Sequence, residues 1–296
     1  MKKKNLSLSR VLTLIVTISL FSGLGVGCSS KSNSAKVAKP VTEIKVGTTS
    51  DEPRIWEAIQ KKLAKENIKI KIVNFANGAN PNVALADGEI DLNAFQHYAY
   101  LNKNKGDLKL DLTAIGDTLI VPLDLFSKKV KSVNELKDGS KIALPNDPIN
   151  EGRALHVLES AGIIKLKDGV GLNPTLKDVT SNSKNIKFVE LVGAQIPRSL
   201  GDVDAAVINC GFAVDAGLDP TKDPIYKDKI NLTDANKKPY INIIVARTKD
   251  KDKEIYKKIV AAYQSDEIAK LITQIYKGAA IPAWDKKYAD ALNSQK

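Results

Sequence analysis

Strand and helix patterns alternate along the chain from about residue 43 onward, and this alternation restricts the fold more than any other feature. Residues 43–47 and 68–73 have the apolar pattern of strands, and a helical spacing of Ile, Ile and Leu over residues 53–65 separates them. Further strands are expected at residues 141–145, 186–191, 203–208 and 240–246, and further helices at 82–86, 153–161, 195–200 and 254–276. This alternation predicts an α/β fold with largely parallel sheets.

A cluster of aromatic residues occupies positions 93–101, after a helix end, a glycine turn and a short strand at residues 89–92. The cluster is therefore expected at the carboxyl end of a strand, where open α/β sheets bind ligands. Phe95, Tyr98 and Leu101 recur at helical spacing and also fit the core face of a helix. His97 and Tyr100 fall off that face, so a pocket role is considered for them beside core packing. Aromatic rings suit an apolar ligand side chain, and a histidine ring nitrogen can add a hydrogen bond.

A second informative stretch covers residues 148–155, where Asn150 is expected to cap a helix and Arg153 to lie in its first turn. Free N–H groups and the helix dipole attract an anion at such a position, and a guanidinium can bind a carboxylate through two hydrogen bonds. A surface arginine is the ordinary alternative. However, a cation at a helix start is unfavourable without an anion beside it. Asn209, at the end of a buried strand, and Asn242, inside an apolar one, either satisfy local backbone groups or face a ligand.

These stretches together resemble the methionine-binding lipoprotein family of the MetQ/NlpA type, the substrate receptors of methionine ABC importers. The matching segments are Phe95-Gln96-His97 with Tyr100-Leu101, Pro81-Asn82-Val83-Ala84-Leu85, Pro145-Asn146-Asp147-Pro148, Asn150-Glu151-Gly152-Arg153-Ala154-Leu155, Val207-Ile208-Asn209 and Pro239-Tyr240-Ile241-Asn242. The resemblance implies that Arg153 binds the ligand carboxylate. It also implies that Asn209 and Asn242 bind the ligand's amino and carboxyl groups, and that Phe95, His97 and Tyr100 belong to the same site.

The resemblance also implies a two-lobed, periplasmic-binding-protein-like fold of type 2 with a ligand cleft between the lobes. Residues 43–122 and 243–296 are expected to form lobe 1, and residues 123–242 lobe 2. The chain would cross between the lobes near residues 121–125 and 239–243, and ligand binding would close the cleft about this hinge.

The N-terminal segment has the features of a targeting signal. Residues 1–27 combine a basic start, an apolar stretch and small residues directly before Cys28, which resembles a lipobox although Gly25 stands where leucine is usual. Cys28 is expected to be lipidated, with ordinary secretion as the alternative. Residues 28–42 are polar and read as a flexible tether. If Cys28 is lipidated, Cys210 has no partner for a disulfide within the chain.

Two departures from the family bear on the ligand. Gly78 stands where methionine receptors usually have an aromatic residue, so Trp56 or Phe75 is expected to fill the gap, or the pocket is larger. A larger pocket would admit a methionine-containing dipeptide or another apolar amino acid. After Asn209 the family often has Gly-Asn-Tyr, whereas this chain has Cys-Gly-Phe, so the polar contacts on that side are expected to differ from those of the family.

Composition and motifs argue against other classes. The net charge of +11 comes from lysines that mostly alternate with acidic residues, so a nucleic-acid partner is not expected. Two histidines on separate elements are too few for a metal site. The sequence contains no Gly-x-Ser-x-Gly motif, so a hydrolase of that type is not expected. His156, near Arg153, is interpreted as an ordinary surface or core residue.

The prediction is a monomeric, lipid-anchored receptor on the extracytoplasmic face of the cell membrane. It is expected to have no enzymatic activity and no cofactor, and to deliver L-methionine or a related amino acid to the permease and ATPase of an ABC importer. The alternatives are a receptor for a methionine-containing dipeptide, or a cell-surface interaction protein that keeps the fold without transport.

Overall fold

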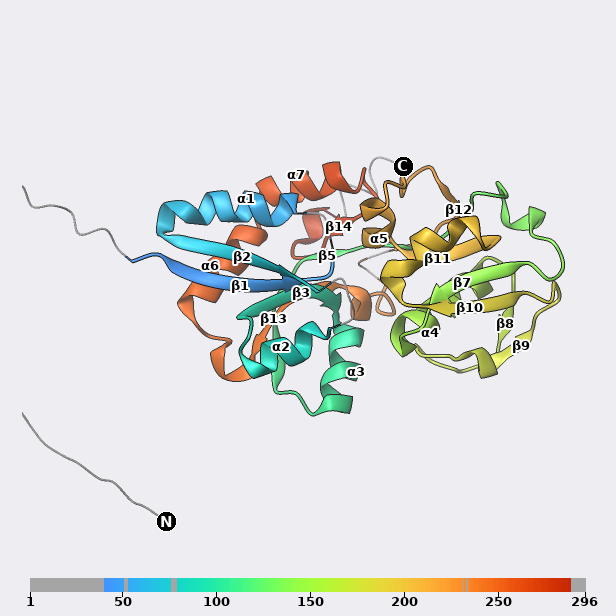
Figure 1. Ribbon diagram of the computed structural model, residues 1–296, viewed down its shortest axis with the longest axis horizontal. Coiled ribbons are helices and arrows are strands. Elements are labelled where there is room, and N and C mark those ends of the chain that lie inside the picture. The colour runs from blue at the N-terminus through green and yellow to red at the C-terminus, as the bar shows by residue number, and fades with distance from the viewer. Residues whose placement is uncertain (1–39, 51–52, 76–78, 231, 233, 289–296) are drawn as a thin grey trace, which may run out of the picture. The chain divides into compact units, whose positions relative to one another are not determined.

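The computed structural model describes residues 40–50, 53–75, 79–230, 232 and 234–288, and within them the chain forms two five-stranded sheets (Figure 1). The first sheet has the strand order β2 (Ile68–Asn74), β1 (Thr42–Thr48), β3 (Leu92–His97), β13 (Asn242–Arg247) and β4 (Leu112–Asp117). The second has the order β10 (Lys187–Leu191), β7 (Lys141–Pro145), β11 (Ala205–Asn209), β6 (Leu123–Phe126) and β12 (Pro224–Tyr226). Two short pairs join β5 (Leu119–Ile120) to β14 (Ile281–Pro282) and β8 (Lys165–Leu166) to β9 (Val179–Ser181). We call the first sheet with its helices lobe 1 and the second lobe 2.

Helices cover both faces of each sheet, as the strand–helix alternation predicts. In lobe 1 they are α1 (Arg54–Leu63), α6 (Glu254–Tyr263) and α7 (Asp266–Ile275) on one face, and α2 (Pro81–Asp87) and α3 (Tyr98–Leu108) on the other. In lobe 2, α4 (Pro148–Ser160) packs on one face, while α5 (Cys210–Asp215) and a long 3-10 helix pack on the other. The 3-10 helices are Ala64–Glu66, Val133–Glu135, Leu176–Asp178, Gly193–Gly201, Lys238–Tyr240 and Thr248–Asp250.

The sheets are mixed, so the expectation of largely parallel sheets was wrong. In lobe 1 the pairs β1–β2 and β1–β3 are parallel, whereas β13 runs antiparallel to both β3 and β4. Lobe 2 repeats this arrangement, with β7 parallel to β10 and β11, and β6 antiparallel to β11 and β12. The antiparallel strands β6 and β13 are the first strands after each passage of the chain from one lobe to the other. A strand that enters a sheet from the neighbouring lobe is not restricted to the direction that a helical crossover gives.

Two local expectations also changed. The short strand expected to start before the aromatic cluster lies later, because β3 runs from Leu92 to His97, while Tyr98 and Tyr100 lie on α3. Phe95 therefore lies on a strand and not on a helix face, whereas Leu101 is buried on α3 as its spacing indicates. The helix expected at 195–200 is a 3-10 helix with Pro197 inside it, and a proline removes one of the hydrogen bonds that an α-helix needs.

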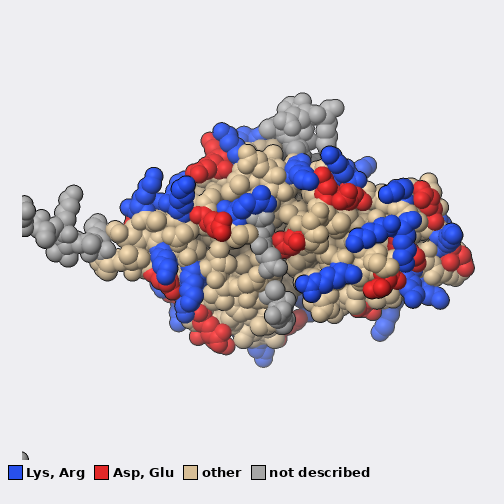
Figure 2. Space-filling model, turned by 45° about the horizontal axis from the view of Figure 1, so that its top comes forward, with Lys and Arg blue, Asp and Glu red and all other residues tan. Residues whose placement is uncertain are grey.

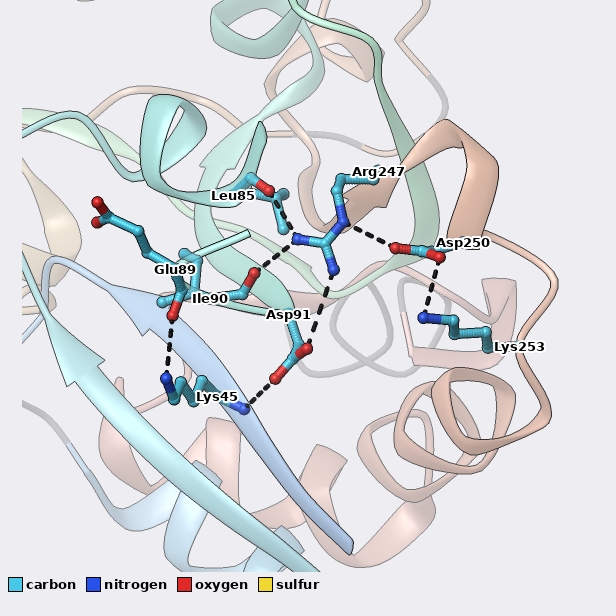
Figure 3. A network of polar contacts seen from close by, with 8 residues as sticks. All are labelled: Lys45, Leu85, Glu89, Ile90, Asp91, Arg247, Asp250 and Lys253. Carbon is cyan, nitrogen blue, oxygen red and sulfur yellow. Dashed lines mark hydrogen bonds and ion pairs between the residues drawn. The ribbon is translucent and has the colours of Figure 1, made fainter. Parts of the chain in front are cut away.

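Arg247, the last residue of β13, fixes the connection between α2 and β3 (Figure 3). Its Nη1 donates to the carbonyl oxygens of Leu85 and Ile90 at 2.7 and 2.8 Å, which satisfies acceptors at the end of α2 and in the turn. Asp91 lies beside the guanidinium and accepts the backbone N–H of Lys45 on β1 at 2.8 Å. This network links β13 and β1 to the end of α2 and to the turn directly before β3.

The surface charges are interspersed. On the face shown in Figure 2, lysine and arginine side chains lie next to aspartate and glutamate side chains. Exposed pairs such as Lys103–Asp107, Lys257–Glu254 and Lys258–Glu66 have N–O distances of 2.5–2.7 Å. Among the described residues, none of the helices has the length and apolar character needed to cross a membrane.

Candidate ligand-binding cleft

A cavity of about 470 Å³ lies between the two lobes, and side chains from both lobes line it. All six residues that the sequence singled out for binding line this cavity: Phe95, His97, Tyr100, Arg153, Asn209 and Asn242. They come from β3 and α3, from α4, and from the ends of β11 and β13. Segments separated by more than a hundred residues thus meet at one place, as expected for the edges where parallel strands end.

The lobe 1 side of the cleft is aromatic. Phe95 and Tyr100 meet edge to face with their ring centroids 5.8 Å apart, and Trp56 meets Tyr263 in the same way at 5.7 Å. Phe75 completes this wall. Trp56 and Phe75 were the residues expected to replace a missing aromatic at Gly78, and both line the cleft, while Gly78 lies outside the described residues.

Gly47 on β1 makes room for Phe75. A Cβ at this position would come within 2.6 Å of Ile90 Cδ1 and 3.1 Å of Phe75 Cε2. The absence of a side chain therefore allows the Phe75 ring to lie against the strand.

His97 is the last residue of β3 and caps α3. Its ring is 6% exposed, and Nδ1 accepts the backbone N–H of Tyr100 at 3.2 Å. Burial, and after it the positive charge of Arg153, lowers the pKa of His97 to about 3. At neutral pH the ring is therefore uncharged, and because Nδ1 is an acceptor, the proton lies on Nε2. Within the described residues, no acceptor meets the geometry of a hydrogen bond to this buried Nε2, although the Asn150 side chain opposes the fall in the pKa of His97.

Arg153 lies opposite, on α4 of lobe 2, and is 3% exposed. Its Nη2 donates to the carbonyl oxygen of Val121 at 2.7 Å and pairs with Asp228 at 3.0 Å. The guanidinium carbon lies 4.8 Å from the centre of the Tyr240 ring, and the ring of His97 lies 5.4 Å from the same ring. Arg153 Nε, like His97 Nε2, is buried without an acceptor in the part of the chain described. The two side chains whose buried donors lack an acceptor, Arg153 and His97, therefore both lie beside the Tyr240 ring.

The start of α4 differs from the prediction. The capping residue is Asp147, whose Oδ1 accepts the backbone N–H of Asn150 at 3.0 Å, so Asn150 is not the cap. Because the helix begins at Pro148, Arg153 lies in its second turn and not its first. Aspartate followed by proline is a strong start signal, since proline at the first helical position lacks the N–H that would otherwise be unpaired. The helix terminus is thus already occupied by a protein carboxylate, and the Arg153 guanidinium lies apart from it.

Two asparagines complete the polar side of the cleft. Asn209 ends β11, and its Nδ2 donates to Asn150 Oδ1 at 3.1 Å, while Asn150 Nδ2 donates to Asp147 at 3.0 Å. Asn242 begins β13 and is paired with His97 in the antiparallel register. Burial raises the pKa of Asp147.

Acidic residues behind Arg153 were missed by sequence reasoning. Asp228 pairs with Arg153 and also with Lys237, at 2.8 Å; burial raises its pKa, but these two cations outweigh burial and leave the pKa below its ordinary value. Asp124 accepts the backbone N–H of Asp228 at 2.7 Å, and burial raises the pKa of Asp124 to about 7. Asp228 stands between lysines in the sequence and looks like an ordinary surface residue there. Only the tertiary fold brings it to Arg153.

His156 and Cys210 are the other residues with possible chemistry. His156 Nε2 lies 2.7 Å from the carbonyl oxygen of Gly171, at the surface of lobe 2, as its interpretation as an ordinary residue requires. Cys210 is buried, and burial raises the pKa of its thiol, which disfavours the reactive thiolate. Among the described residues, no group of three or more His, Cys, Asp or Glu side chains could hold a metal ion.

The structure has two α/β lobes with a ligand-sized cleft between them, which is the architecture of the two-lobed substrate-binding proteins. The NlpA lipoprotein family model matches residues 44–284, and the chain belongs to this family. It is 44% identical over 251 residues to the D-methionine-binding lipoprotein MetQ of Escherichia coli, with 83% of this chain and 90% of the relative covered.

Two solved structures are also similar to the chain. A nutrient-binding protein from Burkholderia cenocepacia bound to methionine has 42% identity and a TM-score of 0.75, with 81% of this chain and 99% of that chain covered. The substrate-binding protein of a methionine transporter from Streptococcus pneumoniae has 38% identity and a TM-score of 0.76, with 82% and 96% covered.

Proposed function

We propose that this protein captures methionine outside the cytoplasm and delivers it to an ABC importer. The observation that carries this proposal is the pair of buried donors, His97 Nε2 and Arg153 Nε, that lack acceptors among the described residues. A buried donor without an acceptor is unfavourable. An amino-acid carboxylate is an acceptor-only group, and one placed between the two lobes would satisfy both donors.

The rest of the cleft suits the rest of methionine. The aromatic wall of Trp56, Phe75, Phe95 and Tyr100 suits a thioether side chain, because sulfur makes favourable contacts with aromatic rings. Asn209 and Asn242 are proposed to bind the amino and carboxyl groups. The relatives named for methionine support this assignment.

Residues outside the cleft complete the proposal. Cys28 is proposed to carry the lipid anchor, and residues 28–42 to act as the tether. Residues 28–39 of this segment lie outside the described residues. The passages near residues 121–125 and 239–243 are proposed as the hinge. Arg153 links to the first passage through Val121 and faces Tyr240 in the second, so ligand contact at Arg153 is coupled to both.

Calorimetry with methionine, methioninol and a methionine-containing dipeptide tests the function. Methionine is expected to bind with micromolar or tighter affinity, and methioninol, which lacks the carboxylate, far more weakly. Preference for the dipeptide would identify the alternative receptor. Failure of every ligand to bind would favour an interaction protein that keeps the fold.

A further inference from the structure

A network of uncharged amide side chains lies directly behind the aromatic wall. Asn82 on α2 and Asn93 on β3 are 0% exposed, and Gln96 on β3 is 2% exposed. Asn82 and Gln96 form a reciprocal pair, in which Asn82 Nδ2 donates to Gln96 Oε1 at 2.8 Å and Gln96 Nε2 donates to Asn82 Oδ1 at 2.5 Å. Gln96 Nε2 also donates to Asn93 Oδ1 at 2.8 Å, and Asn93 Nδ2 donates to Asn82 Oδ1 at 2.9 Å.

The network uses the full donor capacity of all three amides. The remaining N–H of Asn93 donates to the carbonyl oxygen of Pro81 at 3.3 Å, and that of Asn82 donates to Asn104 Oδ1 on α3 at 3.0 Å. Six N–H groups thus have acceptors, and the network connects α2, β3 and α3. A fully satisfied buried network defines one arrangement of its members, because every alternative leaves an amide unpaired.

The network encloses an irregularity in β3. β13 pairs Ile243 with Gln96 and Val245 with Asn93, so two steps along β13 correspond to three along β3. β3 therefore carries one extra residue between Asn93 and Gln96, which is a β-bulge. Residues three apart on a regular strand point to opposite faces, whereas these two side chains hydrogen-bond to each other.

The bulge lies where the binding residues are. Ala94 and Phe95 are the residues between its flanks, and His97 follows directly. Bulges near binding sites redirect side chains, and here the redirected strand carries Phe95 and His97 along the cleft. Asn82 and Asn93 do not line the cleft, so they can affect a ligand only through the elements that the network joins, whereas Gln96 itself lines the cleft.

We propose that Asn82, Asn93 and Gln96 are positioning residues for the ligand site, because their amides hold the bulge of β3 and thereby set where Phe95 and His97 stand. The inference rests on the proposed function only for the identity of the ligand. The network carries no ionisable group, so its effect is independent of pH.

The test is the variant Asn82→Leu, which keeps the approximate shape of the side chain and removes all of its hydrogen bonds. Methionine affinity is measured by calorimetry, and the ring nitrogens of His97 by ¹H–¹⁵N spectra of ¹⁵N-histidine protein. The chain has only two histidines, so His156 on α4 serves as an internal reference. The matched control is Leu63→Ala, which leaves a cavity in the lobe 1 core at the last residue of α1.

Asn82→Leu is expected to raise the Kd for methionine by about tenfold or more and to shift the His97 signals, with those of His156 unchanged. Leu63→Ala is expected to lower the melting temperature and leave both readouts as in the wild type. The inference is overturned if folded Asn82→Leu keeps the wild-type His97 signals and binds methionine within about twofold of wild type.

If Asn82→Leu does not fold, Asn93→Ala takes its place, because it removes another amide of the network. The same two outcomes then decide the inference. If the wild type does not bind methionine, the proposed function fails. The His97 signals then still decide whether the network positions the strand.

Discussion

Replacing Arg153 by lysine separates the binding role of the guanidinium from its structural role. The structure shows the structural role, since Nη2 pairs with buried Asp228 and with the Val121 carbonyl oxygen. The proposed binding role rests on Nε, which has no acceptor among the described residues. Arg153→Ala would remove both roles at once. Lysine keeps the positive charge opposite Asp228 but has no equivalent of the Nε donor.

The expected magnitudes follow from these contacts. Loss of one hydrogen bond to a charged ligand group costs about 1.5–3 kcal/mol, which corresponds to a roughly 10- to 100-fold weaker Kd. The loss of the Val121 hydrogen bond should lower the free energy of unfolding by only about 1 kcal/mol. Arg153→Ala should lower it by up to about 3–5 kcal/mol, because it leaves Asp228 buried without the guanidinium, although Lys237 still pairs with that carboxylate.

Calorimetry with methionine and methioninol measures the effect. Arg153→Lys should reduce the preference for methionine over methioninol by about 10- to 100-fold, since only methionine offers the carboxylate. Arg198→Lys, which changes an exposed arginine of the same lobe, should leave both affinities unchanged. The reasoning is refuted if Arg153→Lys binds methionine as the wild type does, or weakens both ligands equally.

Three further predictions concern other parts of the protein. Burial raises the pKa of Asp124 from 3.8 to about 7, so its contribution to the free energy of unfolding is complete below about pH 4 and falls as the pH rises toward 7. Asp124→Asn should remove this decline, up to about 1.4 kcal/mol per pH unit, in urea unfolding over a pH series. Methionine should change the fluorescence of Trp56, and this change should persist in Trp284→Phe and be lost in Trp56→Phe. Trp56→Phe should also bind methionine about three- to tenfold more weakly than the wild type. Asp219, after α5, forms an ion pair of 2.8 Å with Lys277, after α7, across the lobes. Asp219→Asn should raise the Kd for methionine about two- to threefold at low salt and have no effect at high salt. Calorimetry at two ionic strengths measures this difference.

The fold was predictable to the extent that local patterns determine it. The strands near residues 43–47, 68–73 and 141–145, and the helices near 53–65 and 82–86, follow from apolar spacing, which burial in a sheet or on a helix face requires, whereas α3 was not predicted. The helical pattern at 254–276 is broken into α6 and α7, a break that spacing alone did not show. Strand direction was not predictable either, because β6 and β13 enter their sheets from the other lobe.

The site was predictable as a set of residues but not as an arrangement. The six residues named from the sequence line one cleft, while their roles in binding stay predictions. The partner of Arg153 could not be found, because Asp228 is polar, lies between lysines and is buried only by the tertiary fold. Asn82 and Gln96 were named only as parts of matching segments, and the buried network that they form with Asn93 was not predicted, since buried and exposed amides look alike in a sequence.

A crystal structure of the protein grown with methionine tests the central claim most directly. The account predicts the two lobes closed on the ligand, with its carboxylate oxygens within hydrogen-bond distance of His97 Nε2 and Arg153 Nε and its side chain against the aromatic wall. A bound methionine whose carboxylate lies elsewhere, with both of these nitrogens still lacking an acceptor, would contradict it.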